Sequence, residues 1–187
     1  MIRRIVSVVA AGLVLLTACR QNTFPTVEGN VVDATINSVT VETPDGEFVT
    51  VSTLGTNPML VPGVLPGDEV VIAYQLLTDI NVLRAVRLDI VTPSAYRLLP
   101  GIWRDCTGPE EVGLVLAEDG SARAVGLDGL TLQDWSLDGD DLVLTAVDPE
   151  GKAPEKTLLY KIERIDIDSL AVRPAEAGRR LSFSRQR

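Results

Sequence analysis

Between Thr26 and Val91 apolar and polar residues alternate in short runs rich in β-branched side chains, such as Ile36–Glu42 and Leu83–Val91. A period of two places successive side chains on opposite faces of a β-strand. The segment Pro44-Asp45-Gly46 predicts a turn, because proline presets φ and glycine accepts a positive φ. The pattern predicts about five antiparallel strands, which suits a small OB-like barrel over residues 26–92; another small barrel or sandwich remains open.

The same alternation returns after Thr92–Pro100, a segment with two prolines that we interpret as a domain junction. Turn signals then recur about every ten residues, and the pattern predicts about eight short strands in an up-and-down barrel over residues 97–187. The whole chain is therefore expected to be all-β. The expected strands are Gly101–Arg104, Val112–Ala117, Ser121–Gly126, Leu132–Leu137, Leu142–Val147, Thr157–Ile165, Ser169–Arg173 and Arg180–Ser184.

Charge and composition narrow the function. The chain holds 26 Asp and Glu against 17 Lys and Arg, a net charge of −9, which disfavours a nucleic-acid partner. Histidine is absent, so the commonest general base and metal ligand are missing. We expect no enzyme activity, no catalytic residue, no metal and no cofactor beyond a covalent lipid.

Two groups of acidic residues are candidates for calcium binding or for catalysis by paired carboxylates. Asp138, Asp140 and Asp141 would need further oxygen ligands to hold calcium, and a hairpin turn explains them. Asp166 and Asp168 lie on one side of an extended chain, and paired carboxylates can catalyse glycoside hydrolysis, but the sequence indicates no cleft, raised pKa or aromatic platform for them. We interpret both groups as solvated turns.

The chain begins with a charged and then apolar leader. Arg3 and Arg4 precede an apolar run, Ile5–Leu16, which has the length of a signal peptide and is too short to span a membrane as an ordinary helix. The run closes on Leu16-Thr17-Ala18-Cys19, which resembles the lipobox of bacterial lipoproteins. A plain secretory signal with a chance cysteine is the alternative.

The lipoprotein resemblance implies a processed and anchored protein. Residues 1–18 would be the signal peptide, cleavage would fall between Ala18 and Cys19, and residues 19–25 would form a lipidated tether. Cys19 would carry diacylglycerol and a fatty acyl group such as palmitate, so the partner would be a membrane. Arg20 stands where an aspartate usually signals inner-membrane retention, which implies the outer membrane, with the protein facing the periplasm of the cell envelope.

Cys106 is the second of two cysteines, so lipidation of Cys19 would leave it without an intramolecular disulfide partner. A redox-active or partner-linking thiol and a small apolar residue at a barrel rim are both possible. No lysine or histidine close in sequence would lower its pKa, which favours the second interpretation.

Gly101-Ile102-Trp103 opens the first strand of the second barrel and resembles the G-x-W motif of lipocalins. Gly113–Ala122 and Trp135–Leu142 are also similar to short lipocalin-like domains of bacterial lipoproteins. The resemblance implies that Trp103 plugs the closed end of the barrel and that an arginine near the last strand, Arg185 or Arg180, stacks over it.

The resemblance gives two hypotheses for function. The first is a non-enzymatic, lipid-anchored envelope module that binds or contacts another envelope protein; the alternative is a carrier or sensor of a small apolar ligand in the distal barrel. Trp135, Tyr160 and Phe183 are the candidate ligand-binding residues, and core packing is the competing explanation for them. The strands are short for a lipocalin, so side chains could fill the barrel.

Overall fold

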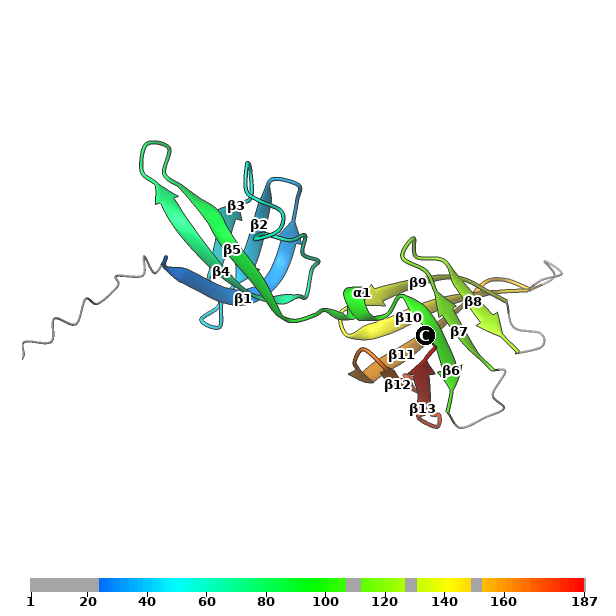
Figure 1. Cartoon of the computed structure of the whole chain (residues 1–187). Coiled ribbons are helices and arrows are strands. Elements are labelled where there is room, and N and C mark those ends of the chain that lie inside the picture. Colours follow the sequence, from blue (N-terminus) through cyan, green and yellow to red (C-terminus); the bar gives the residue numbers. More distant parts are fainter. Residues whose placement is uncertain (1–23, 107–111, 127–130, 149–152, 187) are drawn as a thin grey trace, which may run out of the picture.

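The computed structural model describes residues 24–106, 112–126, 131–148 and 153–186. Over these ranges the chain forms two β-barrels joined by one turn of helix (Figure 1). No helix in the described ranges is long and apolar enough to cross a membrane. The leader and Cys19 lie outside the described residues, so what the sequence predicts for them remains a prediction.

The first barrel has five strands in the closed order β1-β2-β3-β5-β4, as the OB-like prediction requires. Its ladders are antiparallel except for one parallel contact between β3 and β5, and pairing of β1 with β4 closes the sheet. The strands are β1 (Thr26–Ala34), β2 (Ser38–Glu42), β3 (Phe48–Ser52), β4 (Glu69–Leu77) and β5 (Val82–Thr92).

Alternation along these strands builds the interior of the first barrel. Val39 and Val41 on β2, with Val51 on β3, turn inward and are almost fully buried, while Thr40 and Thr50 face outward and share a hydrogen bond of 2.9 Å. The predicted turn forms between β2 and β3, where Gly46 has φ of 81°. Branched side chains on a strongly curved sheet therefore fill this small barrel without any tryptophan.

The second barrel has eight antiparallel strands in the order β8-β7-β6-β13-β12-β11-β10-β9, and the prediction of an eight-stranded up-and-down barrel is confirmed. Its two outer strands approach each other through one bridge, Ser121 to Asp134, so the barrel is nearly closed. The strands are β6 (Gly101–Asp105), β7 (Gly113–Leu116), β8 (Ala122–Val125), β9 (Thr131–Asp138), β10 (Asp141–Val147), β11 (Lys156–Ile165), β12 (Ser169–Pro174) and β13 (Leu181–Arg185).

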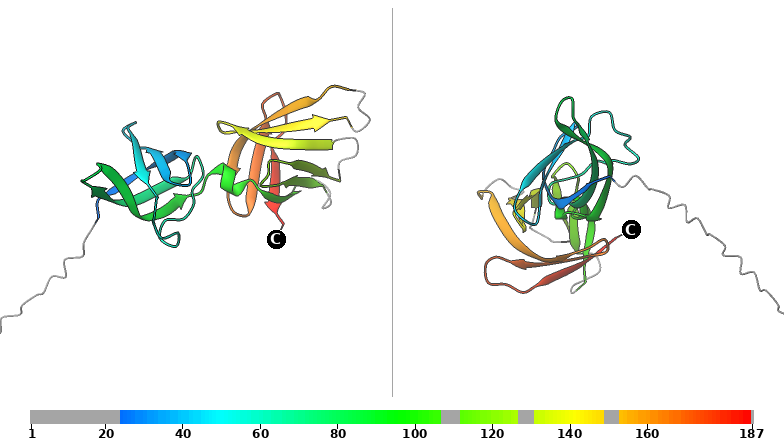
Figure 2. Two further views of the ribbon diagram at one scale, coloured as in Figure 1. Left: turned by 90° about the horizontal axis from the view of Figure 1, so that it is seen from above. Right: turned by 90° about the vertical axis from the view of Figure 1, so that its left-hand side faces the viewer.

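Between the barrels the junction holds a helix that the sequence pattern did not predict, α1 (Ala95–Leu98) (Figure 2). Leu99, at its end, is fully buried in the core of the second barrel. Ser94 and Arg97 face the first barrel, where both bind Asp68. A segment of two prolines and one helical turn therefore contacts both barrels.

Asp68 is fully buried at this joint. Its carboxylate accepts hydrogen bonds from the backbone N–H of Leu65 (2.8 Å) and Ser94 (2.7 Å) and an ion pair from Nη2 of Arg97 (2.9 Å). Burial raises the pKa of Asp68, but the hydrogen bonds from Arg97, Ser94 and Leu65 outweigh it and hold the pKa below its ordinary value of 3.8. The ionised form is thus the one the fold stabilises.

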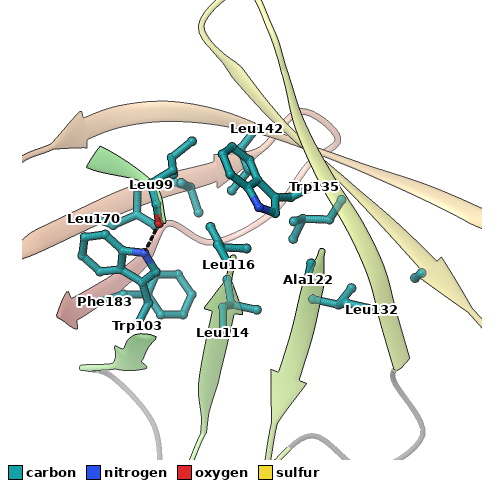
Figure 3. Packing of buried hydrophobic residues seen from close by; sticks show 13 residues of the cluster. Leu99, Trp103, Leu114, Leu116, Ala122, Leu132, Trp135, Leu142, Leu170 and Phe183 are labelled. Atoms are coloured by element: carbon teal, nitrogen blue, oxygen red, sulfur yellow. Dashed lines mark hydrogen bonds between the residues drawn. The ribbon is translucent and has the colours of Figure 1, made fainter. Parts of the chain in front are cut away.

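Arg185 covers one end of the second barrel, over the indole ring of Trp103. Its guanidinium lies 4.2 Å from the ring centroid of Trp103 and donates hydrogen bonds to the carbonyls of Leu98, Pro100 (2.6 Å) and Ile167 (2.6 Å). The indole N–H of Trp103 donates to the carbonyl of Leu99 at 2.7 Å, as the dashed line in Figure 3 shows. A cation–π interaction of this kind stabilises the folded state by roughly 0.5–2 kcal/mol.

Gly101 is required beside this arginine for a steric reason. A Cβ at Gly101 would collide with Nη1 of Arg185, and the backbone φ of 150° is one that side chains rarely adopt. The two residues of the G-x-W motif thus act together. Trp103 stacks against the face of the Arg185 guanidinium, and Gly101 leaves room for its Nη1 atom.

We expect Asp68→Asn to lower the free energy of unfolding by about 1–3 kcal/mol at neutral pH, because the amide cannot pair with Arg97 and loses two charge-assisted bonds. The folded pKa is depressed, so this stabilisation is present above about pH 4 and is lost as the pH falls through the lower folded value. Urea unfolding of the wild-type protein and of Asp68→Asn between pH 7 and pH 3 should show that the difference in their free energies of unfolding becomes smaller in acid. Asp89→Asn, an exposed carboxylate paired with Arg87, is the control; an equal loss there would contradict the assignment.

We expect Gly101→Ala to destabilise the second barrel by roughly 1–3 kcal/mol, because the methyl group displaces the guanidinium from Trp103. Gly139→Ala is a matched control, since Gly139 also has a positive φ (59°) but no atom stands within 4 Å of a Cβ there. Thermal unfolding followed by tryptophan fluorescence measures both. Equal losses in the two variants would mean that backbone strain, and not the collision with Arg185, is responsible.

Candidate functional site

The second barrel is not packed solid: it contains a partly open cavity of about 200 Å³. The cavity lies toward the end of the barrel away from Arg185, where β6 ends and β7 begins. Most of its wall is leucine, valine and aromatic carbon. The lining residues are Asp105, Val112, Gly113, Leu114, Leu132, Leu142, Leu144, Leu158, Tyr160, Val172, Leu181 and Phe183.

Strand alternation explains why these residues line the cavity. Along β11, Leu158, Tyr160 and Ile162 pack toward the core, while Leu159 and Lys161 between them are exposed. This is the inward face that the period-two pattern predicts for the strand. On β10, Leu142 and Leu144 lie directly opposite Tyr160 and Leu158, so the two strands present one continuous apolar wall.

Two polar side chains interrupt the apolar wall, Asp105 and Tyr160. Tyr160 is half-buried, and burial raises the pKa of its hydroxyl above the ordinary value of 10, so the group is neutral at physiological pH. Asp105 ends β6, where its backbone N–H donates to the carbonyl of Val112 at 2.9 Å. The wall of the cavity is therefore mainly apolar, as a small apolar ligand would require.

Sequence reasoning did not single out Asp105, although a signal for it existed. Trp103 was expected to point inward, and a period of two places Asp105 on the same face of the strand. An acidic residue at an inward position of a barrel strand is unusual enough to be informative.

The three candidate ligand-binding residues occupy different places. Tyr160 and Phe183 line the cavity. Trp135 does not: its indole N–H donates to the carbonyl of Ala117 at 2.7 Å, which holds the ring in the closed part of the core near Leu116 and Leu142 (Figure 3). Its edge lines an open groove beside α1 instead.

Of the other residues weighed from the sequence, Cys106 is exposed just beyond the end of β6 and is a free thiol. It follows Asp105 but does not line the cavity. Its exposure is what the interpretation as a rim residue implies, and the structure places no disulfide on it.

The carboxylate of Asp166 stabilises the turn before β12. Asp166 accepts hydrogen bonds from the backbone N–H of Asp168 and Ser169 and from the Ser169 hydroxyl, and it pairs with Arg164. Led by the Ser169 hydroxyl, these bonds lower the pKa of Asp166, the opposite of what a catalytic acid needs. Within the described ranges no three His, Cys, Asp or Glu side chains gather as a metal site.

A match to a protein-family model supports the fold of this barrel. A family model described as lipocalin-like matches residues 96–186. A solved lipocalin-like protein from Bacteroides thetaiotaomicron is 26% identical, with a TM-score of 0.39, over 46% of this chain and 95% of its own. A comparison with curated proteins gives no significant match.

The matched segment begins in α1 and ends just after Arg185, so it holds the cavity, the G-x-W motif and the arginine that covers it. A lipocalin-like fold suggests a module that binds a small ligand, and such proteins are generally binders and not enzymes. Residues 96–186 of this chain match the lipocalin-like family model, and the second barrel has a lipocalin-like fold.

Proposed function

We propose that the protein is a non-enzymatic binding module whose lipocalin-like barrel holds a small apolar ligand in the cavity lined by Tyr160 and Phe183. The single observation that supports this most is the cavity of about 200 Å³ inside a barrel of this fold. Well-packed protein interiors leave few voids larger than a water molecule. An apolar cavity of this size is therefore unusual and suits a bound ligand.

The position of the cavity in the second barrel supports ligand binding as its explanation, in preference to loose packing of the core. The closed half of the same barrel is filled by Trp103, Leu116 and Leu170, each at most 1% exposed. The other half, lined by leucines and valines together with Tyr160 and Phe183, leaves space between its side chains. Burial of ligand carbon against such walls stabilises a complex by about 25 cal/mol per Å² before the costs of association.

We expect Leu158→Trp to fill the cavity and lower affinity for an apolar probe at least about tenfold, because the indole would occupy the space of the ligand. The neighbouring Leu159→Trp is the matched control, since Leu159 lies on the outer face of the same strand and is 38% exposed. Titration of the chain from Arg20 onward, which carries every described residue, with 2-phenylethanol in a calorimeter measures the difference. Absence of binding by the unchanged protein would overturn the proposal, as would equal binding by both variants.

We further propose that this module is attached to the bacterial outer membrane through a lipid on Cys19, and that the protein faces the periplasm. The support is the sequence: two arginines, an apolar run and Leu16-Thr17-Ala18-Cys19. A mature chain with two or more acyl groups would remain on a membrane, because each buried CH₂ contributes about 0.8 kcal/mol. An envelope protein that contacts the anchored module is the second candidate partner.

We expect Cys19→Ala to abolish incorporation of a palmitate analogue and to leave the leader uncleaved, because lipidation precedes processing at such motifs. Cys106→Ala should retain both the label and the mature size, which makes it the control for cysteine loss. Metabolic labelling and intact mass spectrometry of the mature protein measure the two outcomes. A Cys106→Ala chain that loses the label, or a wild-type chain that never carries it, would refute the anchor.

A further inference from the structure

We propose that one end of the first barrel contacts the membrane that holds the lipid on Cys19. Three exposed apolar side chains of this end, which we call the apolar end, enter the layer between the lipid headgroups and the acyl chains: Ile36, Leu54 and Ile80. The inference rests on the proposed lipid anchor, because it names the surface of the protein that the same membrane would contact.

Three turns of the first barrel lie together at the apolar end (Figure 1). They are the β1–β2 turn, the turn that follows β3 and the β4–β5 hairpin turn. The backbone N–H of Thr53 donates to the carbonyl of Asn37 at 2.8 Å, which holds the first two turns side by side. Ser52, at the end of β3, pairs with Arg84 near the start of β5, which places the hairpin turn at the same end. The turns comprise residues 35–37, 53–56 and 78–81.

Each of the three turns presents one large apolar side chain to solvent. Ile36 is 92% exposed, Leu54 is 65% exposed and Ile80 is 61% exposed. None of them belongs to the buried core of the first barrel or packs against it, and turns usually carry small or polar residues. Packing therefore does not account for these side chains, whereas apolar side chains gathered on a surface mark a site of contact with a protein or a membrane.

The charges of the first barrel are distributed unevenly between its ends. The three turns of the apolar end hold one charged residue, Asp79, and no lysine or arginine. The β2–β3 turn at the other end of β2 carries Asp45 and Glu47. Contact between the apolar end and a membrane would therefore depend on burial of apolar area and not on attraction to anionic headgroups.

The position of the tether supports a lipid surface as the partner of this end. The carbonyl of Pro25 accepts a hydrogen bond from the backbone N–H of Tyr74 at 2.9 Å, so the tether joins the barrel beside β4. From Tyr74 to Ile80 the chain covers at most about 20 Å. The segment from Cys19 to Pro25 can also span about 20 Å when extended. A lipid on Cys19 can therefore lie level with Ile80.

The test uses a weak anchor, so that a contribution from the apolar end can be measured. The chain from Cys19 onward carries every described residue, and in a Cys106→Ala background its Cys19 thiol is alkylated with one tetradecyl chain. A single chain of this length binds membranes only marginally and reversibly. Sedimentation with phosphatidylcholine vesicles then measures the partition coefficient. Because the lipid is attached chemically, the result does not depend on lipidation in the cell.

We expect Ile36→Ser, Leu54→Ser and Ile80→Ser each to lower the partition coefficient at least about fivefold, because each removes apolar area from the contact. Phe48→Ser and Val91→Ser are the matched controls. Phe48 is 66% exposed and Val91 is 59% exposed, but they lie at the other ends of β3 and β5. These two variants should keep the partition coefficient within about twofold of the parent. Far-ultraviolet circular dichroism reports on the folding of all five variants.

The outcomes separate this inference from the anchor on which it rests. Equal partition by the parent and all five folded variants would overturn the contact of the apolar end and leave the anchor standing. A native chain whose Cys19 never carries palmitate would refute the anchor, and this inference with it. If Leu54→Ser dissociates a dimer in solution without changing partition, the apolar end binds a second copy of the chain and the lipid contact is refuted.

Discussion

The guanidinium of Arg185 organises the second barrel. It covers Trp103 at 4.2 Å and binds carbonyls of the segment that leads into β6 and of the turn before β12. One end of the barrel is thereby filled with indole and leucine, and the remaining free volume collects at the other end.

The same end of the barrel also joins the two domains. Leu99 enters the second core, and its carbonyl receives the indole N–H of Trp103. A few residues earlier, Ser94 and Arg97 bind the buried carboxylate of Asp68 in the first barrel. An ionised, fully hydrogen-bonded group at a joint fixes geometry in a way that apolar contact alone does not. Asp68 thus links the first barrel to the junction through both a backbone hydrogen bond and an ion pair.

The cavity and the lipid anchor that we propose would be separable properties of the protein. The cavity depends on the tertiary packing of the second barrel. The anchor proposed at Cys19 would depend on the sequence before Phe24. The first barrel, which has no tryptophan and few cations, lies between that segment and the second barrel along the chain.

The sequence alone determined the all-β class and the approximate strand positions, because a period of two is a local property. The resemblance to lipocalins pointed to Gly101, Trp103 and either Arg185 or Arg180, and the tertiary structure places Arg185 over the ring. The sequence did not determine that α1 forms, since a single turn between prolines gains its stability from Leu99 and Asp68, which belong to different barrels. It could not separate Trp135, held in the core by Ala117, from Tyr160 and Phe183, which line the cavity. Inward orientation follows from periodicity, but whether an inward side chain meets another side chain or a void depends on how strands distant in sequence pack together.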